Sequence, residues 1–233
     1  MRQLIRRLGH LVIRLSDLGK SQTVLDLSGD RYLEWSWVAA HLPDNPGKVL
    51  DFGCGVAFLG LTAAIKGGEV TGLDLQPVHL SCEQENLKIL TADILDFDFG
   101  KKKFDVIINC SSIEHVGLAG RYDSTHVPEG DLVAMGRLRH LLRVPTGIMI
   151  LTLPVGRDSV FPPLHRVYGV RGLHMLLRGF HVVKKEFWSK MEGYNVWRRV
   201  SQEQALATEP SKSFYALGFF VLKADHSVSQ NGE

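Results

Sequence analysis

Two glycines and two acidic residues stand where short apolar runs of this chain end. Gly53 and Gly55 follow the run 49–52, and Asp74 closes the next run, 23 residues after Asp51. Glycines two apart let the backbone turn sharply and approach a ligand without side-chain interference. A carboxylate that ends the following strand accepts hydrogen bonds from the hydroxyl pair of a ribose. This pattern therefore predicts a nucleoside-binding site.

The kind of nucleoside ligand is indicated by a missing third glycine. A dinucleotide-binding Gly-x-Gly-x-x-Gly loop needs glycine at the position of Phe58, and Gly60 comes two residues too late. The third glycine allows close packing of helix and strand around a pyrophosphate. Its absence disfavours NAD and favours a ligand without phosphates.

A second polar group follows the fourth apolar run, which ends at Cys110. His115 is the first candidate for a general base, because an ordinary histidine pKa of about 6.5 leaves the ring mostly neutral at pH 7. His165 is the alternative base, and the sequence does not separate the two. Glu114 is a candidate to orient His115 or a substrate hydroxyl. Loops after adjacent strands carry the candidate substrate contacts Tyr122, Asp123, Arg166 and Tyr168.

A metal ion is not expected, because the residues that could bind one have no recognised ligand spacing. Those residues are Glu114, His115, Asp123 and His165. The three cysteines, Cys54, Cys82 and Cys110, are odd in number and far apart. Their spacing disfavours a disulfide framework and is typical of a reducing compartment, here the cytoplasm. We interpret Cys54 as a small filler beside the glycine loop rather than as a nucleophile.

From Lys48 onward, short apolar runs alternate with helix-like segments. Such alternation indicates a mostly parallel sheet with helices on both faces, that is, a doubly wound α/β fold. The predicted helices cover 31–41, 58–66, 130–142 and 170–177. The predicted strands cover 49–52, 69–73, 87–92, 104–110, 148–153, 181–188 and 214–223. The last two strands have no helix between them, so we expect them to pair antiparallel at one edge of the sheet.

Three regions are expected along the chain. Residues 1–45 form N-terminal helices that cover the core, residues 46–224 form the main domain, and residues 225–233 form a disordered tail. The polar stretch 190–212 is a candidate lid insertion, with a mobile edge loop as the other interpretation. A helical apolar stripe in the first region packs on the domain or binds a partner or a membrane surface. It consists of Leu4, Leu8, Leu11, Leu15 and Leu18.

Composition disfavours two classes of partner. Of the 233 residues, 45% are hydrophobic and 22% are charged, which is typical of a soluble globular chain. Lysine plus arginine exceed aspartate plus glutamate by only 27 to 25, too little for the concentrated basic footprint of a nucleic-acid binder. No stretch approaches the roughly 18 apolar residues of a membrane-spanning helix. Nucleic acids and membranes are therefore not expected as partners.

The motifs together resemble the class I S-adenosylmethionine-dependent methyltransferases over about 49–223. The segments that carry the resemblance are 49–55 (Val-Leu-Asp-Phe-Gly-Cys-Gly), 72–74 (Gly-Leu-Asp), 91–94 (Thr-Ala-Asp-Ile) and 104–107 (Phe-Asp-Val-Ile). Ala57 stands where many members carry a third glycine, and its side chain is small enough to be compatible with cofactor binding. The resemblance implies a Rossmann-like methyltransferase fold, with a mostly parallel seven-stranded sheet whose last strand is antiparallel.

The resemblance also implies a cofactor, S-adenosyl-L-methionine, and a role for each matching residue. Gly53 and Gly55 would face its methionine part, and Asp74 would bind its ribose. The pair 93–94 would contact the adenine, and the main chain of Cys110 would lie beside the amino group. The full set implied to bind the cofactor is Asp51, Gly53, Cys54, Gly55, Asp74, Leu75, Asp93, Ile94 and Cys110.

A narrower resemblance covers segments after the fourth and fifth strands. They are similar to a little-characterised branch of the methyltransferases, known mostly as a domain of unknown function. The segments are 112–118 (Ser-Ile-Glu-His-Val-Gly-Leu), 120–123 (Gly-Arg-Tyr-Asp), 153–156 (Leu-Pro-Val-Gly) and 165–168 (His-Arg-Val-Tyr). This resemblance implies the same fold and names no substrate.

We therefore predict an enzyme that methylates a small molecule or a saccharide, at oxygen because candidate bases are present. Residues 109–112 (Asn-Cys-Ser-Ser) lack the Asn-Pro-Pro-Tyr-like sequence of enzymes that methylate amide or adenine nitrogen. The alternative is a non-catalytic binding protein of the same fold, attached to a partner or a membrane surface by residues 4–18. An NAD-dependent oxidoreductase is disfavoured by Phe58. The oligomeric state is open, with a homodimer as one option.

Overall fold

Apolar runs without polar alternation become the central strands of a sheet that is covered on both faces. Every residue of β4 (Val106–Cys110) is buried, and in β5 (Ile148–Val155) only the first residue is not. Continuous burial of this kind is typical of strands with helices on both sides. The structure is a computed structural model that describes residues 30–80, 84–120, 122, 125–191 and 196–225.

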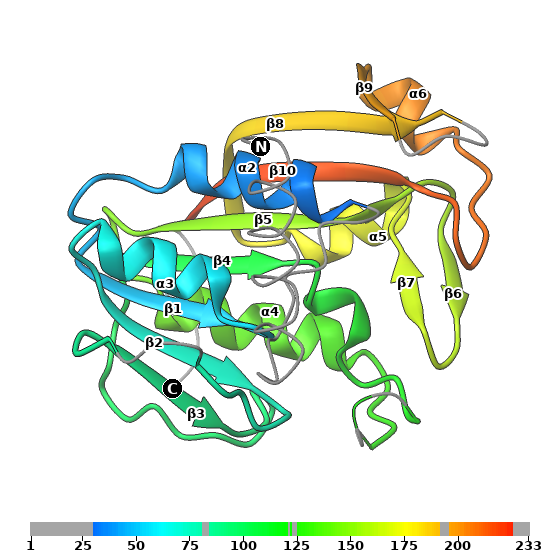
Figure 1. Cartoon of the computed structure of the whole chain (residues 1–233). Coiled ribbons are helices and arrows are strands. Elements are labelled where there is room, and N and C mark those ends of the chain that lie inside the picture. Colours follow the sequence, from blue (N-terminus) through cyan, green and yellow to red (C-terminus); the bar gives the residue numbers. More distant parts are fainter. Residues whose placement is uncertain (1–29, 81–83, 121, 123–124, 192–195, 226–233) are drawn as a thin grey trace, which may run out of the picture.

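The central sheet has the strand order β3-β2-β1-β4-β5-β10-β8-β9 (Figure 1). Strands β1 to β5 run parallel, β10 runs antiparallel to both of its neighbours, and β9 runs antiparallel to β8. The order reverses at β1, which pairs with β2 on one side and with β4 on the other. The other strands of this sheet are β1 (Lys48–Phe52), β2 (Glu69–Asp74), β3 (Leu87–Thr91), β8 (Phe180–Lys190), β9 (Trp197–Val200) and β10 (Ala216–Ala224).

The predicted fold class is confirmed, with one correction to the strand count. The final strand β10 is antiparallel, as expected, and it pairs with β8. The sheet, however, has eight strands rather than seven, because β9 pairs along the outer side of β8. The β8–β10 pair therefore does not form the edge of the sheet. A four-residue strand such as β9 is too short to produce a clear alternating pattern.

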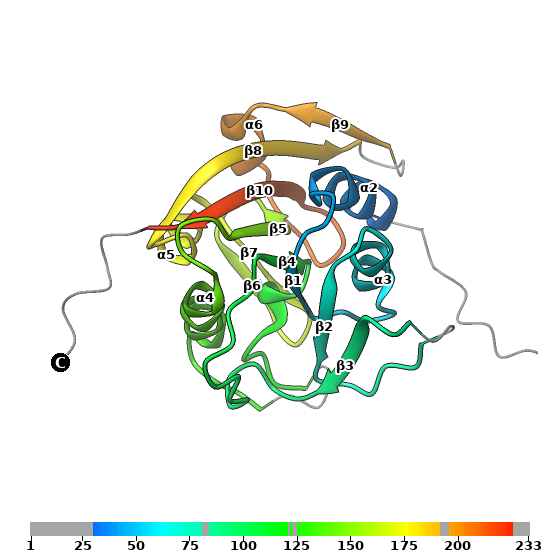
Figure 2. The same ribbon diagram turned by 90° about the vertical axis from the view of Figure 1, so that its left-hand side faces the viewer.

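Helices cover both faces of the sheet, which Figure 2 shows from the side. Helices α2 (Arg31–His41) and α3 (Phe58–Ile65) pack on one face, and α4 (Gly130–Leu141) and α5 (Val170–Leu176) pack on the other. These boundaries agree with the predicted ones to within one residue. Gly67, with a φ of +91°, ends α3 by adopting the left-handed conformation that closes many helices.

Three short elements were not predicted. Strands β6 (Ser159–Phe161) and β7 (His165–Val167) form a separate antiparallel hairpin after β5. Helix α6 (Gln202–Leu206) begins with a capping box between Ser201 and Gln204. This Ser-x-x-Gln pattern is a helix-start signature that the sequence does contain. The hairpin strands have three residues each, so they carry no periodicity from which to predict them.

Some predicted regions are not tested by the described residues. The leucine stripe 4–18 and residues 226–233 of the predicted tail lie outside them. The stretch 190–212 contains β9 and α6, and none of the described residues that line the cavity below comes from it. Its role as a lid stays a prediction. Within the described part of the chain, no helix is long and apolar enough to cross a membrane.

Candidate active site

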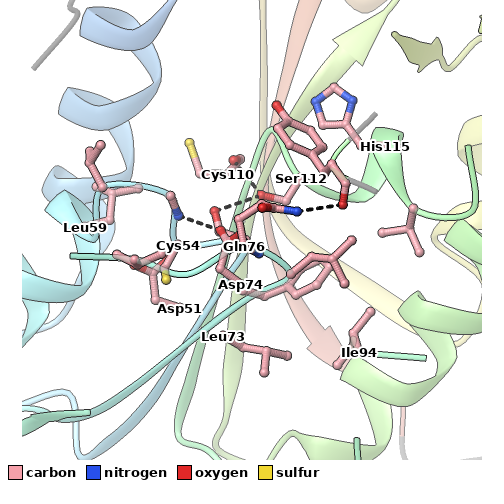
Figure 3. A pocket seen from close by; sticks show the side chains of 18 of the residues that line it. Asp51, Cys54, Leu59, Leu73, Asp74, Gln76, Ile94, Cys110, Ser112 and His115 are labelled. Atoms are coloured by element: carbon pink, nitrogen blue, oxygen red, sulfur yellow. Dashed lines mark hydrogen bonds between the residues drawn. The ribbon is translucent and has the colours of Figure 1, made fainter. Parts of the chain in front are cut away.

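A cavity of about 510 Å³ opens beyond the carboxyl ends of β1, β2 and β4, where the strand order reverses. Open α/β sheets bind their ligands at such a reversal point. His115 and Tyr122 line the cavity from positions after β4. Figure 3 shows His115 in this wall. The cavity is also lined by all nine residues that the sequence assigned to a cofactor, namely Asp51, Gly53, Cys54, Gly55, Asp74, Leu75, Asp93, Ile94 and Cys110.

Asp74 joins the glycine loop to the end of β2. Its carboxylate accepts hydrogen bonds from the backbone N–H of Gly55 at 2.8 Å and of Gln76 at 2.9 Å. A carboxylate offers about four acceptor positions, so about two remain for the hydroxyls of a ligand. The Gln76 side chain donates to the carbonyl oxygen of Tyr122 at 2.9 Å (Figure 3). This bond holds Tyr122 at the cavity wall.

Gly53 is held in a conformation and at a distance that other residues do not tolerate. Its φ is +67°, and a Cβ atom added to it would lie 2.2 Å from Oγ and 2.5 Å from Cβ of Ser112. Gly55 has a φ of +52° but open space around it. Ala57 also adopts a left-handed φ of 56°, although it carries a side chain. The loop therefore keeps the glycine-like backbone at all three positions.

Aromatic rings form an apolar wall of the cavity. Trp35 of α2 stacks on Phe58 of α3 with 4.7 Å between the ring centroids, and both line the cavity. Trp37, on the same helix, packs in the core against Phe219 at 5.2 Å. Trp35 thus lines the cavity, whereas Trp37 belongs to the core.

Burial shifts the pKa values of an acid and two thiols beneath the glycine loop. Burial raises the pKa of Asp51 to about 7, although a hydrogen bond from the Gly60 backbone favours the carboxylate. Burial also raises the pKa values of Cys54 and Cys110, which are free thiols, well above the ordinary cysteine value. A reactive cysteine needs a lowered pKa. Neither thiol is therefore suited to act as a nucleophile.

His115 ends η1 (Ile113–His115), a single 3₁₀ turn that follows β4. Its Nδ1 lies 2.6 Å from the carbonyl oxygen of Leu164. Because a carbonyl oxygen can only accept, this contact places the hydrogen of a neutral ring on Nδ1 and makes Nε2 the basic nitrogen. The ring of Tyr122 meets that of His115 edge-on at 5.7 Å.

Glu114 is buried and is not among the residues that line the cavity. Its Oε1 lies 3.7 Å from His115 Nε2, and its Oε2 has no hydrogen-bond partner among the described residues. Burial raises the pKa of Glu114 to about 8, so the carboxyl group is neutral at pH 7. The expectation that Glu114 orients His115 stays a prediction.

A second buried glutamate, Glu34 of α2, was not predicted. It accepts hydrogen bonds from the hydroxyls of Ser111 and, at 2.6 Å, of Thr152. Burial, together with Asp30, raises its pKa to about 7. Arg31 lies 3.8 Å from its other oxygen. The sequence did contain a signal that Glu34 is buried. Glu34 precedes the apolar residues Trp37 and Val38 by three and four positions, so it shares their face of the helix.

Arg166 and Tyr168, expected to contact a substrate, do not line this cavity. The Tyr168 hydroxyl donates to Asp131 at 2.9 Å, and Arg166 Nε lies 3.4 Å from the same carboxylate. Arg166 also donates to the carbonyl oxygens of Glu114 and Val116. The polar groups of both side chains are thus used to hold neighbouring segments. Their expected substrate contact is not met in this cavity.

His165, the alternative base, is also outside the cavity. It is buried, with ring contacts to Phe161 at 5.7 Å and to Tyr215 at 5.2 Å. Of the two histidines, His115 is the one that lines the cavity. Asp123 lies outside the described residues.

Several cavity residues were missed by the sequence analysis as site residues. They are Arg31, Phe58, Gln76, Ser112 and Val116. Gln76 and Ser112 follow the ends of β2 and β4 by two residues, so their positions could have suggested them. Arg31 carried no such signal, because only the packing of α2 brings it to the sheet. Among the described residues, no three metal-ligating side chains gather in one place.

The parallel sheet with its reversal at β1, the inserted antiparallel strand and the cavity at the reversal point define the Rossmann-like fold of class I methyltransferases. The chain belongs to the DUF268 family, described as a Caenorhabditis protein of unknown function, whose model matches residues 63–211. The description of the family names no substrate.

Curated relatives match a shorter stretch of 93 residues. The chain is 33% identical to a putative methyltransferase, YqeM, of Bacillus subtilis, over 36% of this chain and 37% of the relative. It is 29% identical to the ubiquinone biosynthesis O-methyltransferase of Stutzerimonas stutzeri, over 36% of this chain and 40% of the relative. The chain thus spans about two fifths of the length of these relatives.

The fold matches solved structures over nearly its whole length. One is the 1,6-didemethyltoxoflavin-N1-methyltransferase of Burkholderia thailandensis, crystallised with its substrate and S-adenosylhomocysteine. The TM-score is 0.55 at 19% identity, and the match covers 93% of this chain and 90% of that one. This likeness shows the fold.

Proposed function

We propose that this protein is an S-adenosylmethionine-dependent methyltransferase that acts on a small molecule or a saccharide, at oxygen. The observation that carries the proposal is that the nine residues implied to bind the cofactor all line one cavity at the reversal point of the sheet. The curated relatives and the fold neighbour, which are named as methyltransferases, support it.

The residues of the cavity fit the chemistry of the cofactor. Asp74 has acceptor positions left for the two ribose hydroxyls. The open space at Gly55 leaves room for the methionine part, which would lie against main chain rather than side chains. Ile94 is buried and offers an apolar surface to an adenine ring. When bound, S-adenosylmethionine supplies a methyl group activated by a sulfonium sulfur.

Arg31 suits the carboxylate of the methionine part. It is the only lysine or arginine among the described residues that line the cavity. Its side chain is 39% exposed, and its partner Glu34 lies at the long distance of 3.8 Å. Burial raises the pKa of Glu34 to about 7, so this carboxyl group neutralises the charge of Arg31 only in part. The guanidinium can therefore pair with an anionic group of the ligand.

His115 is the proposed general base. An alcohol gains nucleophilicity when a positioned base removes its proton, an effect of about 10²- to 10⁴-fold. The Nδ1 contact with Leu164 leaves Nε2 to take that proton. Acceptor alignment and the exclusion of water by the aromatic wall supply the rest of the barrier lowering.

Oxygen is proposed as the acceptor atom because of His115 rather than because of the relatives. One curated relative is named as an O-methyltransferase and the fold neighbour as an N1-methyltransferase. A neutral ring nitrogen or amine needs less help from a base than a hydroxyl does. A base that lines the cavity therefore favours a hydroxyl acceptor.

Isothermal titration with S-adenosylmethionine tests the proposal. We expect micromolar binding to the wild-type protein and at least about 100-fold weaker binding to Asp74→Ala, because two charge-assisted hydrogen bonds are lost. The exposed Asp96→Ala is the matched control and should bind as the wild type does. Absence of binding at millimolar cofactor by a folded wild-type protein would contradict the proposal.

A binding protein without turnover is the alternative for the same fold. Its supporting feature, the leucine stripe 4–18, lies outside the described residues. Deleting residues 1–20 separates the two. The enzyme reading expects the shortened protein still to bind the cofactor, whereas loss of a partner or vesicle association alone would assign the stripe an attachment role.

A further inference from the structure

The β6–β7 hairpin contacts the turn that carries His115 at two points. The tip of the hairpin supplies the Leu164 carbonyl oxygen, 2.6 Å from His115 Nδ1. One strand, β7, supplies Arg166, whose guanidinium contacts the main chain of η1. The hairpin itself is fastened to β5, because Tyr168 N–H donates to the Pro154 carbonyl at 3.1 Å.

The guanidinium of Arg166 holds the backbone on both sides of His115. Its Nη1 donates to the carbonyl oxygen of Val116 at 2.6 Å and to that of Glu114 at 3.3 Å. A planar guanidinium offers several N–H donors in a fixed geometry, which a flexible ammonium cannot reproduce. The two carbonyl groups that flank the histidine are therefore fixed by one side chain.

The guanidinium is in turn oriented by a buried carboxylate. Arg166 Nε lies 3.4 Å from Asp131 Oδ1, and the Tyr168 hydroxyl donates to Asp131 Oδ2 at 2.9 Å. The side chains of Arg166 and Asp131 are only 13% and 7% exposed. Charge-assisted hydrogen bonds that are shielded from water are stronger than exposed ones.

We propose that Arg166, oriented by Asp131 and Tyr168, is the positioning residue for His115, and that the hairpin holds the imidazole as the Nδ1–H tautomer with Nε2 as its basic nitrogen. This inference rests on the proposed function in that His115 is the base of that reaction. It assigns to Arg166 and Tyr168 a role behind the site, in place of the substrate contact expected from the sequence.

Nitrogen NMR of the histidine rings tests the inference without an acceptor. The protein is labelled with ¹⁵N-histidine, and long-range ¹H–¹⁵N spectra report the tautomer of each ring. His115→Gln identifies the His115 signals among those of the ten histidines. We expect the wild-type ring of His115 to be a single Nδ1–H tautomer at a pH where it is neutral.

Arg166→Met removes all donors while keeping a similar apolar stem. We expect the single-tautomer signature of His115 to be lost and the midpoint of its titration to move, with partial recovery in Arg166→Lys, which restores one donor group. Arg171→Met, on the exposed start of α5, is the matched control and should leave the His115 signals unchanged. Wild-type His115 signals in folded Arg166→Met would overturn the inference.

A second variant keeps the test decisive if Arg166→Met does not fold. Asp131→Asn keeps the size of the side chain and removes the charge that orients the guanidinium, so the same change in the His115 tautomer is expected, to a smaller degree. Unchanged signals in folded Asp131→Asn would likewise count against the inference. A thermal melt of each variant establishes that it is folded.

Failure of the inference and failure of the proposed function are distinguishable. Titration with S-adenosylhomocysteine reports on the cofactor site, whereas the NMR spectra report on the histidine. If the protein binds no S-adenosylhomocysteine but the Arg166 variants change the His115 tautomer, the methyltransferase proposal is contradicted and the positioning role is supported. If the protein binds S-adenosylhomocysteine and the His115 signals are unchanged in the Arg166 variants, the proposed function is supported and the positioning role is contradicted.

Discussion

The Asp74 carboxylate accepts a hydrogen bond from the Gly55 backbone N–H at 2.8 Å, and this bond joins the end of β2 to the loop after β1. The same carboxylate therefore shapes the glycine loop and faces the cavity. A residue with these two tasks is sensitive even to conservative replacement.

Asp74→Asn is expected to weaken cofactor binding although it keeps the shape of the side chain. An amide has one accepting oxygen, so it cannot serve Gly55, Gln76 and two ribose hydroxyls together. We expect about 10-fold weaker binding of S-adenosylhomocysteine by calorimetry, less than in Asp74→Ala. Binding at wild-type strength would show that the carboxylate does not meet the ribose.

Gly53→Ala is expected to destabilise the fold by about 1–3 kcal/mol, because the new methyl group overlaps Ser112 and the backbone is left-handed. Gly55→Ala, with the same backbone strain but open space, should cost only about 1 kcal/mol. Urea unfolding measures both. The double variant Gly53→Ala with Ser112→Gly should recover part of the loss, and no recovery would rule out the overlap as its cause.

Arg31→Gln is expected to distinguish two ligands that differ in one group. S-adenosylhomocysteine carries the methionine carboxylate, and 5′-methylthioadenosine lacks it. Loss of a charge-assisted pair should weaken the first by about 10-fold and leave the second within about twofold. Calorimetry with both ligands makes the comparison. If S-adenosylhomocysteine binds equally well to the variant, Arg31 does not bind the methionine carboxylate. It would then be a candidate to bind an anionic group of the acceptor.

Stability is expected to fall as pH rises from 5 to 9, and Glu114→Gln should reduce that fall. Burial raises the folded-state pKa of Glu114 from 4.5 to about 8. The folded protein therefore binds more protons than the unfolded chain between these values. The stabilisation is complete below pH 4.5 and is lost as pH rises through 8, by an amount of order a few kcal/mol.

Urea unfolding at pH 5 and pH 9 checks this dependence. Glu114→Gln mimics the neutral acid at both values, so its stability should change less than that of the wild type. Part of the pH dependence of stability should remain in Glu114→Gln, because the pKa values of Asp51 and Glu34 are also raised to about 7. Glu69→Gln, at an exposed position, is the control. Parallel pH curves for the wild type and Glu114→Gln would contradict the assignment.

Much of the fold follows from local patterns in the sequence. The helices 31–41 and 130–142 and the core strands carry periodicity or continuous apolar runs, and their boundaries agree with the structure to within a few residues. The resemblance to class I methyltransferases implied the cofactor set, and its members lie at or close to the carboxyl ends of strands. Parallel strands bring those ends together whatever the details of packing.

The catalytic side of the cavity could not be worked out in this way. The sequence made His115 the first candidate base and His165 the alternative without separating them, and only the structure shows that His115 lines the cavity and His165 does not. His165 lies in a three-residue strand whose orientation depends on its pairing with β6. That pairing joins residues through tertiary contacts and leaves no periodic signal.

The sequence by itself determined the fold class and the strand ends whose residues should be inspected, because strand ends and glycine turns are encoded locally. Only the tertiary structure decided that Arg166 binds the carbonyl groups of Glu114 and Val116 instead of lining the cavity. It also decided that the buried Glu34 accepts a hydrogen bond from Thr152. These contacts join residues 50 to 118 positions apart. Their energies depend on burial and geometry, which no local pattern contains.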